Sequence, residues 1–146
     1  MIIITDCNEI ISAIYAPKGA VAQIFSSKSK IQFLAPDYIL EEVFEHLQDI
    51  AEELGLPSHE VRKRLADITK AIIITEVAKI PKKYIVEAVE IAKDIDPEDA
   101  PYIALHLYKK HKIWTSDKVL INGLKKKGYT ICVTTSELKK HLYKKS

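Results

Sequence analysis

The side chains in this sequence that are best suited to metal-dependent chemistry are those of four acidic residues: Asp6, Glu42, Asp99 and Asp117. Carboxylates that lie close together repel one another unless protons or a cation relieve the repulsion. Their oxygens are also the ligands that hard divalent cations such as Mg²⁺ and Mn²⁺ prefer. If folding brings the four acids together, we expect a site for such ions.

Five short apolar runs predict the strands of a sheet. The runs are continuously apolar or β-branched, which is typical of strands buried on both faces of a parallel sheet. They cover residues 2–5, 31–35, 72–75, 113–116 and 130–133. Helical patterns lie near residues 8–15, 18–27, 39–54, 58–70, 82–93, 99–110, 117–127 and 136–144, and Thr134 with Glu137 predicts a capping box for the last helix. Strands that alternate with helices predict a doubly wound α/β/α sandwich, a single domain over residues 1–146.

The predicted topology explains why the four acids would meet. Parallel strands all end at the same edge of a sheet. Asp6 and Asp117 directly follow the first and fourth predicted strands. Glu42 lies in the first two turns of the helix that leaves the second strand, and Asp99 starts the helix that runs back before the fourth strand. All four acids should therefore lie at the carboxyl edge, where open α/β sheets bind ligands.

Helical spacing distinguishes Glu42 from Glu41. At about 100° per residue, the apolar stripe of helix 39–54 is centred close to Val43. Glu42 lies on the flank of this stripe and can face the sheet edge. Glu41 lies nearly opposite and should face water.

Two aspartates and an asparagine near the predicted site have alternative roles. Asp96 and Asp99 are both suited to a helix N-cap, and Pro101 favours a helix that begins near Asp99, because proline further inside a helix removes a backbone hydrogen bond. Together with the other three acids, Asp99 is interpreted as a ligand, and Asp96 as either a cap or an outer partner of the site. Asn8 either caps its helix or orients the carboxylate of Asp6.

Five further residues lie near the same edge. Thr115 and Ser116 either bind a metal-bound water or only end a strand. Tyr38 and Tyr102 either stack bases near the mouth of the site or belong to the core or an interface. Trp114, in a buried strand, is predicted to be core.

The net charge of +2 hides an uneven distribution. Residues 1–108 hold 11 basic and 18 acidic side chains, whereas residues 109–146 hold 11 lysines against Asp117 and Glu137 alone. A lysine-rich segment next to an acidic site suits a polyanionic ligand that must approach bound metal. The alternative is a solvated surface rich in Lys and Glu. The candidate phosphate contacts are Lys118, Lys125, Lys126 and Lys127.

The two cysteines and the hydropathy exclude other classes of protein. Cys7 and Cys132 have no CxxC spacing, so they predict neither a zinc site nor a disulfide scaffold, and we interpret them as buried thiols at strand ends. No run approaches the ~18 apolar residues of a membrane span. Met1 leads straight into an apolar strand without a charged targeting segment. We expect a cytoplasmic protein.

The sequence resembles PIN domains, the family of small metal-dependent ribonucleases that includes the VapC-type toxins. The resemblance rests on four pieces, which agree in order, spacing and predicted context and span essentially the whole chain. These are Asp6-Cys7-Asn8 with Ser12-Ala13, Ile39-Leu40-Glu41-Glu42-Val43, Asp96-Pro97-Glu98-Asp99 leading into Ile103-Ala104-Leu105, and Trp114-Thr115-Ser116-Asp117-Lys118. One departure is Cys7, where Thr or Ser is common in the family; it should affect packing more than chemistry.

The resemblance implies a five-stranded parallel sheet in the order 3-2-1-4-5 and hydrolysis of single-stranded RNA. The four acids would bind Mg²⁺ or Mn²⁺ and form the catalytic set. One or two metal ions there would lower the pKa of a bound water and orient it towards a phosphodiester. PIN domains often form homodimers. A toxin would have an antitoxin partner encoded beside it, whereas an RNA-processing nuclease would not.

Other readings of the acidic residues fit less well or remain open. A receiver domain needs an Asp at the end of the third strand, where this chain has Glu76. A haloacid-dehalogenase phosphatase needs DxD after the first strand, where this chain has Asp6-Cys7-Asn8, and nucleotide-binding glycine loops are absent. The main alternative is a nuclease-inactive RNA-binding or partner-binding module with the same fold.

Overall fold

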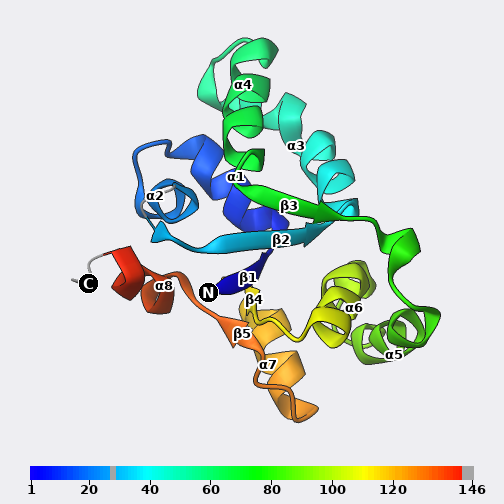
Figure 1. Ribbon diagram of the computed structural model, residues 1–146. Helices are drawn as coiled ribbons and strands as arrows, with labels where there is room; N and C mark the ends of the chain where they lie inside the picture. The colour runs from blue at the N-terminus through cyan, green and yellow to red at the C-terminus, as the bar shows by residue number, and fades with distance from the viewer. Residues whose placement is uncertain (27–28, 143–146) are drawn as a thin grey trace.

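The computed structural model describes residues 1–26 and 29–142 and contains a five-stranded sheet (Figure 1). The strands are β1 (Ile2–Thr5), β2 (Gln32–Pro36), β3 (Ile72–Thr75), β4 (Ile113–Trp114) and β5 (Cys132–Val133). Neighbouring strands pair in parallel, in the order β3-β2-β1-β4-β5. The predicted α/β class and the strand order are confirmed.

Helices flank this sheet. They are α1 (Cys7–Tyr15), α2 (Ala20–Phe25), α3 (Tyr38–Leu54), α4 (Ser58–Thr69), α5 (Lys82–Ala92), α6 (Ala100–Lys109), α7 (Lys118–Lys126) and α8 (Thr135–Leu142), with short 3₁₀ turns η2 (Val77–Lys79) and η3 (Pro97–Asp99). In Figure 1, α1, α3 and α4 lie on one side of the sheet, and α5, α6 and α7 lie on the other. Helix α8 packs against α2. The three predicted layers are therefore present.

An aromatic cluster forms the centre of the core. The rings of Phe25 and Phe33 have centroids 5.0 Å and 5.7 Å from that of Trp114. Trp114 is fully buried, as predicted, and its Nε1 donates a hydrogen bond to Oγ1 of Thr135 at 3.1 Å. This bond satisfies the polar atom of the indole and ties the end of β4 to the start of α8.

The element boundaries differ from the predicted ones mainly at strand ends. The predicted strand 113–116 ends at Trp114, because the backbone N–H of Asp117 bonds to Oγ1 of Thr115 and turns the chain into α7. The runs predicted at 31–35 and 130–133 appear as 32–36 and 132–133. Helix α2 covers only part of the prediction for 18–27. Residue 27 and residues 143–144 of the last predicted helix lie outside the described residues.

Helix α8 begins at a modified form of the predicted capping box. The backbone N–H of Glu137 donates to Oγ1 of Thr134 at 3.3 Å, as predicted. The carboxylate of Glu137 accepts from the hydroxyl of Thr134 at 3.2 Å. The side chains of the pair therefore bond to each other as well as capping the helix.

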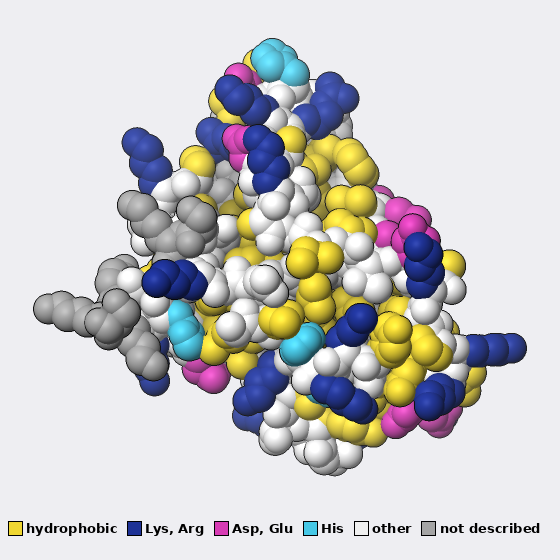
Figure 2. Space-filling model, viewed as in Figure 1, with side chains coloured by type: hydrophobic (Ala, Val, Ile, Leu, Met, Phe, Trp, Pro, Cys, Tyr) yellow, Lys and Arg dark blue, Asp and Glu magenta, His cyan; other side chains and the backbone are white. Residues whose placement is uncertain are grey.

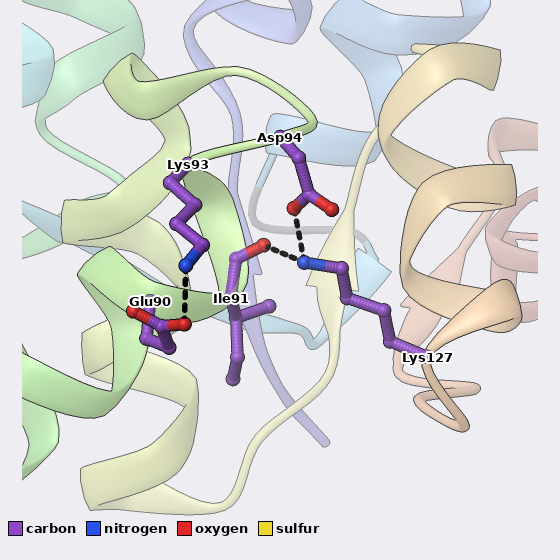
Figure 3. Close-up of polar contacts among 5 residues, drawn as sticks. All are labelled: Glu90, Ile91, Lys93, Asp94 and Lys127. Carbon is purple, nitrogen blue, oxygen red and sulfur yellow. Dashed lines mark hydrogen bonds and ion pairs between the residues drawn. The ribbon is translucent and has the colours of Figure 1, made fainter.

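Helix α7 is held against the segment that joins α5 to α6. A Cβ on Gly123 would lie 2.8 Å from Cγ1 of Ile95, so only glycine permits this close approach. Nζ of Lys127 donates to the carbonyl oxygen of Ile91 at 2.7 Å and pairs with the carboxylate of Asp94 (Figure 3). These contacts fix the position of α7 relative to the chain that leads into Asp99.

Both cysteines are free thiols. Cys7 is buried but is the first residue of α1 rather than the last of a strand, and Cys132 is half-buried in β5. Among the described helices, none is both long enough and apolar enough to cross a membrane.

Candidate functional site

Asp6 lies where β1 ends and α1 begins. Its side chain caps α1, with Oδ1 accepting from the backbone N–H of Asn8 at 3.4 Å. Oδ2 accepts a hydrogen bond of 2.7 Å from the hydroxyl of Thr115. Only 8% of Asp6 is exposed, and this burial raises the pKa of its carboxyl; the Thr115 bond opposes the shift and the charge of Asp117 adds to it.

Asp117 and Thr115 form the turn between β4 and α7. The backbone N–H of Asp117 donates to Oγ1 of Thr115 at 3.1 Å. Oδ1 of Asp117 caps α7 by accepting from the backbone N–H groups of Val119 and Leu120, at 3.0 Å and 3.3 Å. Thr115 therefore links the two aspartates, and its hydroxyl does more than end a strand.

Glu42 points from α3 towards the same region. The hydroxyl of Tyr102, on α6, donates a hydrogen bond to Oε1 of Glu42. Burial is the main cause that raises the pKa of Glu42 to about 7; the Tyr102 bond opposes the shift, and the charge of Asp6 adds to it. Glu41 is exposed, as helical spacing predicted. Tyr102 is 2% exposed, so it is a core residue that orients Glu42 rather than a stacking platform.

Asp99 is the acid with the least satisfied carboxylate. It is the last residue of η3, directly before α6, and makes no side-chain capping bond. Among residues 1–26 and 29–142, its Oδ2 is the buried side-chain oxygen without a hydrogen-bond partner. Burial first, and then the charges of Asp6, Asp96, Asp117 and Glu42, raise the pKa of Asp99 to about 7.

The mutual effects of the four acids show that they lie near one another. The charge of Asp6 raises the pKa of Glu42 and of Asp99, and Asp117 raises that of Asp6 and of Asp99. The described residues nevertheless contain no group of three or more His, Cys, Asp or Glu side chains gathered tightly enough to hold a metal ion. Carboxylate oxygens are the ligands that divalent cations prefer, so the four acids fit such an ion in their chemistry. Binding would require side-chain rotations that bring the oxygens closer together.

Glu9 is a further acid at this site that the sequence pattern did not single out. It is 1% exposed, and its Oε1 accepts a hydrogen bond of 3.0 Å from the hydroxyl of Ser116. Burial raises the pKa of Glu9, and the charge of Asp6 contributes to the shift. The signal in the sequence was its position, three residues after Asp6 and hence one helical turn away.

The other residues predicted near the site have mainly structural roles. Asn8 is exposed, and Asp6 rather than Asn8 caps α1; Asn8 contributes its backbone N–H. Asp96 caps η3 by accepting from the backbone N–H of Glu98 at 3.0 Å. Tyr38 is half-buried at the start of α3.

The candidate RNA-binding lysines lie on α7 and at its end. Lys118, Lys125 and Lys126 are exposed. Lys127 follows the helix and is engaged with Asp94 and Ile91, as Figure 3 shows. The structure thus separates Lys127 from the other three.

Comparisons with known proteins agree with this arrangement. The sequence profile of the PIN domain family matches residues 4–143. The structure is similar to a chain in the crystal structure of VapBC2 from Rickettsia felis bound to a DNA fragment from their promoter, with a TM-score of 0.70 and 12% sequence identity, over 92% of this chain and 98% of that chain. No curated protein matches the sequence. At this identity the structural likeness shows the fold alone, whereas the profile spans almost the entire sequence. The chain belongs to the PIN domain family.

Proposed function

We propose that this protein is an endoribonuclease that hydrolyses phosphodiester bonds of single-stranded RNA with the help of Mg²⁺ or Mn²⁺. PIN domains are generally nucleases, and they generally use divalent metal ions. The observation that carries the proposal here is the buried, unpartnered Oδ2 of Asp99 among other carboxylates. A buried polar atom without a partner is unfavourable, and a cation would satisfy it.

The metal would be held by Asp6, Glu42, Asp99 and Asp117. When bound, it supplies a water of lowered pKa and neutralises charge on the phosphodiester. The role of the protein is to orient these ligands. Thr115 fixes the carboxylate of Asp6, and Tyr102 fixes that of Glu42. In most metal sites, neighbouring residues hold the metal ligands in their orientation through hydrogen bonds of this kind.

A cleavage assay tests the activity. Mixed-sequence RNA oligonucleotides should be cut in the presence of Mn²⁺ or Mg²⁺, and a chelator or Asp6→Asn should abolish the cleavage. Asp49→Asn, an exposed acid on α3, serves as the matched control and should retain activity. Cleavage that persists in Asp6→Asn would assign the activity to another site or to a contaminant.

Within this proposal, we favour a toxin with an antitoxin partner and a homodimeric state. The structural neighbour comes from a VapBC2 complex. An adjacent small open reading frame whose product binds this chain would support the toxin role, and its absence would favour an RNA-processing nuclease. Light scattering of the purified protein checks the dimer.

A partner-binding module without nuclease activity is the second candidate. An apolar hollow of about 370 Å³ is lined by residues of α3, α5 and the start of α6, among them Tyr38, Ile85, Val89 and Pro101. Val89 is 53% exposed, which favours contact with apolar groups of a partner. Metal-independent partner binding together with inactivity on every RNA would support this reading.

A further inference from the structure

We propose that Glu9 is a positioning residue that fixes the turn between β4 and α7 through Ser116, and so sets where Asp117 stands relative to Asp6. The consequence for metal binding rests on the proposed function. The positioning itself rests on the geometry of the turn.

The burial of Glu9 calls for a specific role. Its neighbours on the buried stripe of α1 are Cys7, Ile10, Ala13 and Ile14, so an apolar residue would suit the position better. Ion pairs in the described part of the chain do not include Glu9. Its carboxylate accepts a hydrogen bond from the hydroxyl of Ser116, 107 residues away in sequence.

Two hydroxyl–carboxylate bonds join α1 to the turn. Thr115 donates to Asp6 at 2.7 Å, and the next residue, Ser116, donates to Glu9 at 3.0 Å. Asp6 and Glu9 are one helical turn apart. Backbone bonds from Thr115 N–H to Val133 and from Asp6 N–H to Trp114 hold the start of the turn in the sheet. The Ser116 bond adds an anchor one residue further along, directly before Asp117.

Asp117 follows Thr115 and Ser116 directly, so the orientation of these two residues determines that of the Asp117 backbone. Ligands of a metal site must be held within about 0.5 Å of their productive positions. If the Glu9–Ser116 bond is lost, we expect Asp117 to sample positions from which it cannot share a cation with Asp6. Glu9 would act through Ser116 without touching the metal.

The test compares Ser116→Ala, Glu9→Ala, the double variant and Glu9→Gln. Ser116 is exposed, so its replacement should not prevent folding. Glu53→Ala is the matched control: it removes the carboxylate that accepts from the hydroxyl of Tyr15 at the far end of α1. Two quantities are measured: hydrogen exchange of the Ser116 and Asp117 amides without metal, and Mn²⁺ affinity by calorimetry.

Ser116→Ala and Glu9→Ala should each accelerate exchange at these amides by at least about tenfold and weaken Mn²⁺ binding by about 10- to 100-fold. The double variant should be no worse than Glu9→Ala alone, because Glu9→Ala already removes the bond to the hydroxyl of Ser116. Glu9→Gln keeps an acceptor oxygen and should retain the exchange protection of the wild type. Glu53→Ala should change neither quantity.

Two results would overturn the inference. Wild-type exchange and affinity in Ser116→Ala would show that the bond positions nothing. Loss of protection in Glu9→Gln equal to that in Glu9→Ala would show that the charge of Glu9 matters and not the bond. Because the exchange measurement needs no metal, a wild-type protein that binds no Mn²⁺ would overturn the proposed function while leaving the positioning role to be judged by exchange alone.

Discussion

The hydroxyl of Thr115 donates to Oδ2 of Asp6 at 2.7 Å, across 109 residues of sequence. The same hydroxyl oxygen accepts from the backbone N–H of Asp117. Thr115 is fully buried, so water cannot replace either bond. One threonine therefore joins two of the four acids, at the ends of neighbouring strands β1 and β4.

Thr115→Val should weaken Mn²⁺ binding about 10- to 100-fold, since it removes the group that orients Asp6 while nearly preserving volume. It also leaves the carboxylate of the buried Asp6 without its donor and the N–H of the half-buried Asp117 without its acceptor. These losses should lower the free energy of unfolding by about 1 to 3 kcal/mol. Calorimetry and denaturant unfolding measure the two effects. Thr115→Ser, which keeps the hydroxyl, is the control and should bind Mn²⁺ nearly as the wild type does. Equal weakening in both variants would mean that the methyl packing of Thr115, and not its hydrogen bonds, is what matters.

Asp99→Asn should stabilise the metal-free protein at pH 7.5, by about 1 kcal/mol, because it removes one negative charge from a crowded group. The melting temperature should then rise by a few degrees, roughly 2–4 °C for a chain of this size. The same variant should lose the rise in melting temperature that Mn²⁺ gives the wild type. Asp49→Asn is the control: this exposed acid on α3 is not among the charges that raise the pKa of Asp99, so the variant should melt as the wild type does. A melting temperature unchanged by Asp99→Asn would remove Asp99 from the set of interacting acids.

The stability of the metal-free protein should fall as the pH rises from about 4.5 to about 7. Glu42 and Asp99 have ordinary pKa values of 4.5 and 3.8, and the fold raises both to about 7. Between the ordinary and the raised pKa values, the folded chain binds more protons than the unfolded chain. The stability that these two groups contribute is therefore fully present below their ordinary pKa values and is lost as the pH rises through about 7. The combined loss should be on the order of 2 kcal/mol after allowance for partial solvent exposure. Urea unfolding at a series of pH values measures it, and the difference from the Glu42→Gln, Asp99→Asn double variant isolates these two groups. A difference that does not change between pH 4.5 and 7 would contradict the raised pKa values.

The sequence predicts the placement of the acids because that placement depends on topology. Asp6 and Asp117 follow parallel strands, and parallel strands end at one edge whatever their side chains do. Glu42 and Asp99 lie near the starts of helices that touch the same edge. These positions need only the order of strands and helices, which the apolar runs and helical periodicity convey well.

Side-chain partners in this site are less predictable. Asp99 and Asp96 have similar local signals for capping, yet Asp96 makes a capping bond and Asp99 does not. In the sequence, Glu9 looks like any acidic residue in the first turn of a helix, and only the fold shows that it bonds to Ser116. Lys127 and Lys126 are adjacent lysines in one run, and only the packing of α7 gives Lys127 its two partners. Rotamers and long-range contacts decide these cases, and a single sequence does not specify them.

The lysines of α7 should divide into two groups when RNA binding is measured against salt. In Figure 2, Lys and Arg side chains are spread over much of the visible surface, so charge alone does not mark an RNA site. Proximity favours Lys118, which follows Asp117 directly, and exposure permits Lys125 and Lys126 to act with it. The ammonium group of Lys127 is already bonded to the carboxylate of Asp94 and the carbonyl oxygen of Ile91.

We therefore expect that replacing Lys118, Lys125 and Lys126 together with Gln will reduce the slope of log K against log salt by about 2, since each contact with a single-strand phosphate contributes about 0.7. Fluorescence anisotropy with labelled single-stranded RNA measures the slope, and Mn²⁺ affinity should stay unchanged. Lys127→Gln should instead leave the slope unchanged and lower the melting temperature, because it detaches α7 from the segment that leads into Asp99. Lys63 on α4, which is exposed and distant in sequence from the four acids, is the control for a general loss of charge. A triple variant with the wild-type slope would show that these three lysines are a solvated surface. A reduced slope in Lys127→Gln would show that RNA competes for Lys127 with its partners in the fold.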